Sequence, residues 1–183
     1  MARIILITGG TRSGKSEYAR KTAEALPGAR VFVATCVASD EEMSQRIKKH
    51  QQERLKANWD TIEEPLQLAD KLRSIQGFNV FLVDCLTLWI SNLLYQAHKR
   101  ESAFSETDMI DTTNELLDVC SAATGTVIFV TNEVGLGIVP ENNLSRLYRD
   151  LVGRCNQVVA ERADEVIMVA CGLPLNLKRG KQE

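Results

Sequence analysis

A glycine-rich segment near the start of the chain carries the residue types that bind phosphate. It fits the pattern G-x-x-x-x-G-K-[ST] through Gly9, Gly10, Thr11, Arg12, Ser13, Gly14, Lys15 and Ser16. In this pattern glycines let backbone N–H groups turn toward phosphate oxygens, the lysine bridges the outer phosphates and the final hydroxyl binds Mg²⁺. A chance match in a glycine-rich turn is the alternative. A buried strand before the segment and a helix after it favour a phosphate site, with Lys15 catalytic and Ser16 a metal ligand.

Acidic residues follow two of the expected strands. Asp84 ends an apolar strand, which is where P-loop proteins hold Mg²⁺ or its water shell. Asp84 could instead cap the helix that begins near Leu86, and the two roles are compatible. Glu133 follows another apolar strand in a similar position. Because such sheets bind ligands beyond the carboxyl ends of their strands, we expect one shared edge to hold 8–16, Thr35, Asp84 and 131–133.

One of the two histidines suggests a second chemistry. His50 lies on a predicted helix, with Arg46 and Arg54 one turn away on the same face. Nearby positive charge favours the neutral imidazole, which is a nucleophile, and arginines can neutralise a triphosphate under attack. The surrounding lysines, glutamines and glutamate are typical of a solvated helix face, and spacing alone favours that interpretation. His98 lies in a polar connector that we interpret as solvated.

The elements that position these residues alternate between strands and helices. The expected strands are apolar throughout, which is typical of a parallel sheet covered on both faces. The polar stretch 97–106 and the segment 135–143 are interpreted as loops. This order predicts an α/β, three-layer P-loop NTPase fold whose mostly parallel sheet ends in an antiparallel edge hairpin. We expect strands at 3–8, 30–35, 78–84 and 126–131, helices at 13–26, 39–57, 66–75, 86–96, 107–122 and 144–162, and a closing hairpin of 165–170 with 173–177.

Composition limits the class of protein. The chain has 183 residues, of which 44% are hydrophobic and 25% charged, so we expect a single globular domain at 1–178 with a short tail at 179–183. The net charge of −2 and the 5% of aromatic residues argue against binding to nucleic acid or to a membrane surface. No apolar run is long enough to span a membrane. Five cysteines without a C-x-x-C pair indicate a reducing, cytoplasmic setting.

Three segments, taken in order, give the chain a specific resemblance. They are 8–16 (TGGTRSGKS), 46–50 (RIKKH) and 131–142 (TNEVGLGIVPEN). Together they resemble the bifunctional adenosylcobinamide kinase / adenosylcobinamide-phosphate guanylyltransferase family of cobalamin biosynthesis. The segments 153–157 and 164–166 are also similar, so the resemblance covers nearly all of residues 3–178. The third segment is far more specific than a phosphate loop alone.

The resemblance implies two transfer reactions at one phosphate loop. In the first, a nucleoside triphosphate phosphorylates the aminopropanol hydroxyl of adenosylcobinamide. In the second, GTP donates GMP to that phosphate through a guanylylated histidine, which yields adenosylcobinamide-GDP and pyrophosphate. The resemblance therefore implies Mg²⁺, GTP and ATP at the site, and a homo-oligomer that is a trimer.

The resemblance also assigns residues to these roles. It makes His50 the candidate for the guanylylated residue, although some members carry two adjacent histidines where this chain has Lys49 and His50. It implies Glu63 as a guanine ligand, whereas the sequence alone favours an exposed loop acid. Thr11 replaces an alanine that is common in the family, and Asn143 stands where an arginine is frequent. The remaining implied nucleotide ligands are Ala34, Thr35, Cys36, Gln51, Gln52, Glu53, Arg54 and Asp84.

Two other functions use the same loop. A small-molecule P-loop kinase would need no His50 and would leave no covalent nucleotide. A nucleotide-operated regulatory switch would hydrolyse the triphosphate without modifying a corrinoid. Both remain alternatives that labelling of the protein and of the corrinoid distinguishes.

Overall fold

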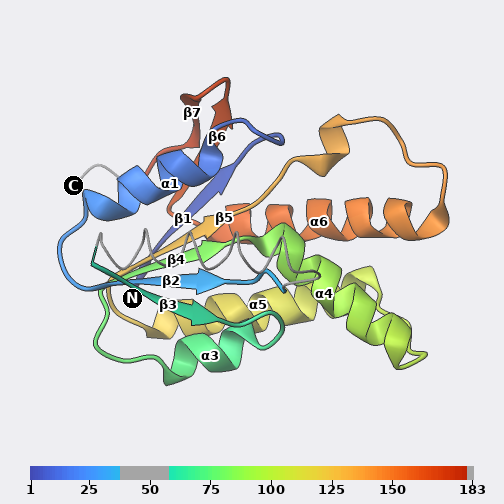
Figure 1. The fold of residues 1–183 in the computed structure, drawn as a ribbon, viewed down its shortest axis with the longest axis horizontal. Coiled ribbons are helices and arrows are strands. Elements are labelled where there is room, and N and C mark those ends of the chain that lie inside the picture. Colours follow the sequence, from blue (N-terminus) through green and yellow to red (C-terminus); the bar gives the residue numbers. More distant parts are fainter. Residues whose placement is uncertain (38–57, 181–183) are drawn as a thin grey trace.

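A seven-stranded sheet forms the centre of the fold (Figure 1). The structure is a computed structural model and describes residues 1–37 and 58–180. The strands are β1 (Arg3–Thr8), β2 (Arg30–Ala34), β3 (Trp59–Glu63), β4 (Val80–Asp84), β5 (Thr126–Val130), β6 (Glu165–Ala170) and β7 (Leu173–Lys178). They lie in the order β3-β2-β4-β5-β1-β6-β7, and only the β6–β7 pair is antiparallel. The predicted mostly parallel sheet with an antiparallel edge hairpin is confirmed.

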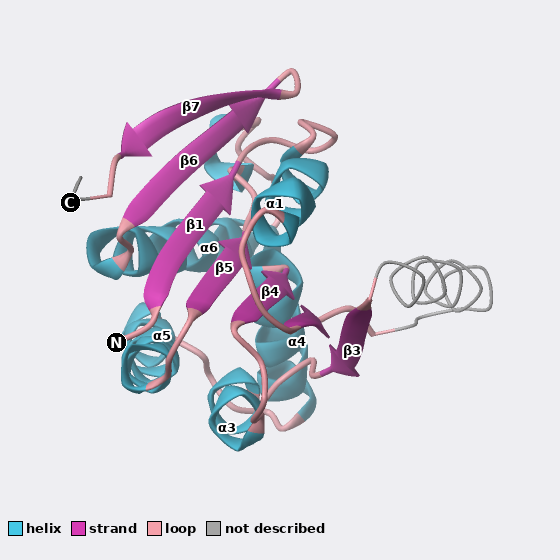
Figure 2. Cartoon of the chain, turned by 90° about the vertical axis from the view of Figure 1, so that its left-hand side faces the viewer, coloured by secondary structure: helices cyan, strands magenta, loops and turns pink. Residues whose placement is uncertain are grey.

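Helices cover both faces of this sheet (Figure 2). They are α1 (Lys15–Glu24), α3 (Leu68–Ser74), α4 (Leu86–Lys99), α5 (Glu106–Ala122) and α6 (Asn143–Arg162). Among the described helices, α1 packs on one face, where Ala19 and Ala23 join an apolar cluster with Ile5, Ile7 and Ile128. The other four pack on the opposite face. The strands are apolar on both sides because both sides are buried, as in other layered α/β folds.

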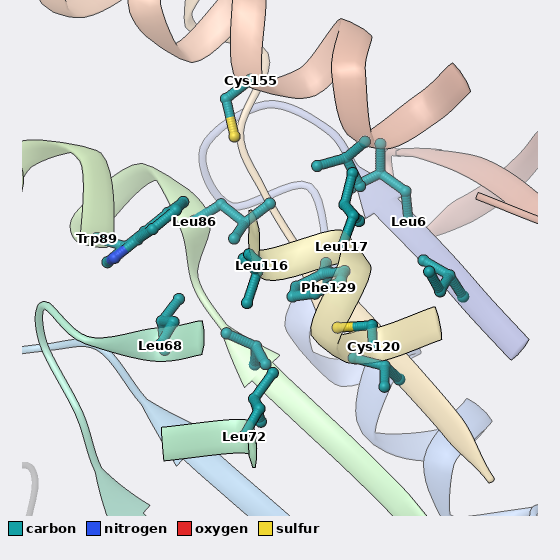
Figure 3. Close-up of a cluster of buried hydrophobic side chains, with 14 of the residues drawn as sticks. Leu6, Leu68, Leu72, Leu86, Trp89, Leu116, Leu117, Cys120, Phe129 and Cys155 are labelled. Carbon is teal, nitrogen blue, oxygen red and sulfur yellow. The ribbon is translucent and has the colours of Figure 1, made fainter. Parts of the chain in front are cut away.

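The larger of the two apolar clusters lies between the sheet and the four helices (Figure 3). Leu86 and Trp89 of α4 meet Leu116 of α5 and Phe129 of β5 there, and each of these side chains is at most 1% exposed. The Trp89 indole N–H donates to Leu66 O at 2.8 Å, so the one polar atom of this ring is satisfied. This packing fixes β4 and β5, whose carboxyl ends lead into the candidate site.

Several element boundaries differ from the sequence interpretation. The strand β3 was not expected, because it is a short edge strand in which only Trp59 is buried and the apolar signal is weak. The segment 97–106 is not wholly a loop, since α4 continues to Lys99 and α5 begins at Glu106, where Ser105 and Asp108 form a capping box. A short 3₁₀ turn, η1 (Val134–Leu136), occupies part of the expected loop after β5. The helix expected at 39–57 lies outside the described residues.

No helix in the described parts of the chain combines the length and apolarity that crossing a bilayer requires.

The five free thiols differ in burial, so a thiol-labelling reagent should modify them at different rates. Burial raises the pKa of Cys120 and of Cys155 to about 12, whereas Cys171 is exposed at the hairpin turn. Because thiolate is the reactive form, we expect a disulfide reagent at pH 8 to modify Cys171 in the native protein, and Cys120 and Cys155 only after unfolding in guanidinium. Peptide mapping by mass spectrometry identifies the modified residues. Native labelling of Cys155 at the rate of Cys171 would contradict the packing of α5 against α6.

Candidate active site

The phosphate loop joins β1 to α1 in a tightly curled conformation. Positive φ angles occur at Gly9 (152°), Arg12 (57°) and Gly14 (92°). The Lys15 ammonium donates to Gly10 O at 3.1 Å, so the side chain lies back along the loop. Gly14 precedes α1 and supplies no side-chain cap, which leaves the first N–H groups of the helix for an anion. The loop therefore has the curled backbone and the open helix start that a phosphate site requires.

The C-terminal hairpin supports this loop from outside. A methyl group on Gly9 would lie 2.3 Å from Val169 O, and one on Gly14 would lie 3.2 Å from the Cα of Gly172. The Gly172 N–H donates to Ser13 O at 2.8 Å. Cys171 and Gly172 have φ angles of 53° and 78°, as in a two-residue type I′ turn. The turn of the hairpin thus packs directly on the phosphate loop.

A pair of adjacent glycines tests this packing. We expect Gly9→Ala to lower the free energy of unfolding by about 2–3 kcal/mol, because the added methyl meets a backbone carbonyl and φ is positive. Gly10→Ala is the matched control. Its added methyl meets nothing within 4 Å, so we expect a change within about 0.5 kcal/mol. Urea unfolding followed by circular dichroism measures both, and equal losses would contradict the proposed contact with Val169.

Three of the expected site residues lie side by side at the carboxyl edge of the sheet. In the strand register Glu63 pairs with Ala34, and Ala34 pairs with Asp84. Asp84 pairs in turn with Val130 of β5, which lies beside β1 and its phosphate loop. Glu63 is therefore the last residue of a strand rather than a loop acid, and this part of the sequence interpretation was wrong. The strand β3, which sequence reasoning missed, is the one that brings Glu63 to the site.

The two residues after β2, Thr35 and Cys36, lie at this edge, and Thr35 ties it to the start of α4. The buried Thr35 hydroxyl donates to Cys85 O and accepts from Cys85 N–H, both at 2.8 Å. Asn92 of α4 donates to Thr35 O at 2.8 Å. Burial raises the pKa of the Cys36 thiol, and the negative charges of Glu63 and Asp84 raise it further. Cys36 and the two carboxylates therefore share one electrostatic environment.

Asp84 is the last residue of β4 and does not occupy the N-cap position of α4. The cap position of α4 is Cys85, and it makes no side-chain cap hydrogen bond. Burial and the Asp84 charge raise the pKa of the Cys85 thiol, while the Lys15 charge acts in the opposite direction. The ammonium of the phosphate loop and the strand-end carboxylate thus both act electrostatically on the same thiol.

Glu133 connects the end of β5 to the phosphate loop. Its Oε1 accepts from the Thr8 hydroxyl at 2.6 Å, and its N–H donates to Gly9 O at 3.2 Å. Asn132 Nδ2 contacts Thr11 Oγ1 at 3.5 Å. One carboxylate oxygen of Glu133 thus holds the end of the strand that enters the loop, which is a structural role.

The residue types at the edge suit Mg²⁺. The exposed Ser16 hydroxyl and the Asp84 carboxylate are hard oxygen ligands. Among the described residues no cluster of three or more His, Cys, Asp or Glu side chains forms a cage for a metal. Mg²⁺ at phosphate-transfer sites needs no cage, because one or two protein ligands, water and substrate phosphates complete its shell.

Part of the expected site falls outside the described residues. These positions are His50 with its neighbours Arg46 and Lys49, and the expected nucleotide ligands Gln51, Gln52, Glu53 and Arg54. Sequence reasoning missed one buried polar residue, Asn156 of α6, which contacts Glu133. The signal that pointed to it is its place in the segment 153–157, one of the segments that carry the resemblance.

Comparison with known proteins assigns the chain to a family. The sequence model described as cobinamide kinase / cobinamide phosphate guanyltransferase matches residues 5–177. The chain is 43% identical over 175 residues to the bifunctional adenosylcobalamin biosynthesis protein CobP of Pseudomonas aeruginosa, covering 94% of this chain and 96% of that protein. It is 38% identical over 185 residues to the Escherichia coli bifunctional adenosylcobalamin biosynthesis protein CobU, covering 96% and 99%. It is 37% identical over 186 residues to CobU of Salmonella typhimurium, also covering 96% and 99%. The chain belongs to the cobinamide kinase / cobinamide phosphate guanyltransferase family, as its motifs predict.

Proposed function

We propose that the chain phosphorylates adenosylcobinamide with a nucleoside triphosphate and then transfers GMP from GTP to the product, giving adenosylcobinamide-GDP and pyrophosphate. The observation that carries the proposal is the single edge at which the phosphate loop meets the aligned residues Glu63, Ala34 and Asp84. Membership of a family described by both activities supports the same two reactions. Both use one phosphate loop, since only one segment of this kind occurs in the sequence.

In the kinase step the substrate hydroxyl oxygen attacks the γ-phosphorus and the bond to the β-phosphate oxygen breaks, releasing a nucleoside diphosphate. The loop N–H groups and the Lys15 ammonium stabilise the charge that develops on the transferred group and on the leaving group. Mg²⁺, held by Ser16 and Asp84, supplies further neutralisation of the phosphate charge when bound. The proton of the hydroxyl leaves to solvent or to a nearby base.

In the guanylyl step a histidine nitrogen attacks the α-phosphorus of GTP and pyrophosphate departs. A phosphate oxygen of the phosphorylated corrinoid then attacks the same phosphorus, and the P–N bond breaks to return the free histidine. We assign this role to His50. Glu63, an exposed carboxylate at the end of β3, is a suitable acceptor for the N–H edge of guanine.

We assign both reactions to a single catalytic domain at 1–178 that acts as a homo-oligomer, a trimer, in the cytoplasm. All five cysteines are free thiols, which fits a reducing compartment. Gel filtration with light scattering tests the oligomeric state.

Two radiolabels test the two reactions separately. The purified protein is incubated with adenosylcobinamide, Mg²⁺ and [γ-³²P]ATP, and then with [α-³²P]GTP, and the corrinoids are separated by chromatography. We expect γ-label in the corrinoid after the first incubation and α-label after the second, with release of pyrophosphate. Corrinoid labelled only by γ-phosphate would leave the small-molecule kinase. Hydrolysis without a labelled corrinoid would leave the regulatory switch.

A further inference from the structure

Asn156 lies in the middle of α6, yet its side chain faces the phosphate-binding end of the sheet rather than solvent. Only 8% of the residue is exposed. Its Oδ1 accepts from the Thr131 hydroxyl at 2.7 Å. Its Nδ2 donates to Asn132 O and to Glu133 Oε1, both at 3.2 Å. One carboxamide thus contacts three consecutive residues after β5.

These contacts continue into the phosphate loop. The Glu133 oxygen that accepts from Asn156 also accepts from the Thr8 hydroxyl at 2.6 Å, and Thr8 is the last residue of β1. The Glu133 N–H donates to Gly9 O at 3.2 Å. The carboxamide of α6 is therefore two hydrogen bonds from the first residues of the loop.

The residue type matters at this place. The position needs an acceptor for Thr131 and two N–H donors for a carbonyl and a carboxylate, and only a side-chain amide supplies both. Glu133 is half-buried, and its Oε1 accepts from both Asn156 and Thr8. Without the Asn156 donor the carboxylate is held by one bond fewer and would turn toward another partner. We infer that Asn156 is a positioning residue for nucleotide binding, which acts through Glu133 on the entry to the phosphate loop.

The inference rests on the proposed function only in requiring that the loop binds a nucleotide. A loop whose N–H groups are already arranged binds phosphate without further ordering cost. Loss of Asn156 should therefore weaken nucleotide binding directly. Because both proposed reactions use this loop, both should slow by the same factor.

The first set of variants measures binding without catalysis. Fluorescence titration with N-methylanthraniloyl-GDP gives the Kd of each purified protein, and its thermal midpoint is recorded alongside. We expect Asn156→Ala and Asn156→Asp to raise the Kd by about 10–100-fold. Aspartate should be the more severe change, because it places a second carboxylate against Glu133. Gln157→Ala is the matched control, since Gln157 is the exposed next residue of the same helix.

The second set separates positioning from other roles of Glu133. Glu133→Gln keeps an oxygen that accepts from Thr8 and Asn156, so it should keep most of the affinity that Glu133→Ala loses. In Asn156→Asp with Glu133→Gln, the new glutamine amide can donate to the new aspartate. We expect this double variant to recover at least tenfold in Kd over Asn156→Asp alone.

The outcomes are distinct. A lower thermal midpoint with an unchanged Kd at temperatures below it would overturn the inference and leave a structural role for Asn156. Glu133→Gln as weak as Glu133→Ala would also overturn it, because the negative charge would then matter rather than the hydrogen bonds. Wild-type protein that binds the nucleotide but labels no corrinoid would contradict the proposed function, while the binding comparison would still test Asn156.

Discussion

Replacing Lys15 with alanine should lower kcat for phosphorylation and for guanylyl transfer by about 10²–10³-fold each. Lys15 is the first residue of α1, and its ammonium lies 3.1 Å from Gly10 O. The ammonium can move from that carbonyl to a bound phosphate. Its positive charge stabilises the charge of the departing group in both reactions. Since one loop is assigned to both, the two losses should be similar. Steady-state assays with adenosylcobinamide and with its phosphate measure them separately.

Lys21→Ala is the matched control for this variant. Lys21 lies on the same helix, is exposed and pairs with Glu17 at 3.5 Å across one helical turn. Exposed pairs of this kind contribute about 0.3–0.5 kcal/mol, so activity should change little. A Lys15 variant that loses one reaction and keeps the other would show that the reactions do not share the loop.

Replacing His50 with alanine should separate the two reactions. Without the nucleophile, guanylyl transfer should fall by roughly 10³-fold or more. Phosphorylation of adenosylcobinamide needs no covalent intermediate, so it should remain. Wild-type protein given [α-³²P]GTP and Mg²⁺ should carry a label that acid removes and base does not, as expected of a phosphoramidate. His50→Ala should carry none.

The other histidine provides the control. His98 is exposed near the end of α4, and the chain has only these two histidines. His98→Ala should keep both the label and both activities. Covalent label that persists in His50→Ala would refute the assignment and direct the search to Lys49, which also forms a phosphoramidate.

Most of the fold could be predicted because its central strands are buried on both faces. Continuous apolar runs such as β1 and β4 are hard to mistake when turn residues bound them. The edge strand β3 was missed for the opposite reason. An edge needs few buried residues, and its polar alternation resembles a loop. The hairpin of β6 and β7 was found because Gly172 marks its turn.

The site could be predicted only where a short, continuous motif determines the local backbone conformation. The phosphate loop is local, so eight residues suffice to specify it. Asn156 meets Glu133 across 23 positions of sequence, and no local pattern shows that one buried amide faces another segment. The sequence could not decide whether Asp84 ends β4 or caps α4, because the last strand residue and the helix cap are adjacent in the chain. Glu63 lies at the carboxyl edge of the sheet because it ends β3, the strand that sequence reasoning missed.

The support of the phosphate loop by the hairpin has a consequence during synthesis. Val169 and Gly172 contact a loop that leaves the ribosome about 160 residues earlier. The strand β1 is flanked by β5 and β6, so it pairs with strands that are synthesised much later than itself. Nascent chains that end before the hairpin lack one wall of the loop, and GTP should not stabilise them. Nucleotide binding should therefore appear only once β6 and β7 have left the exit tunnel, so ligand capture would report completion of the hairpin.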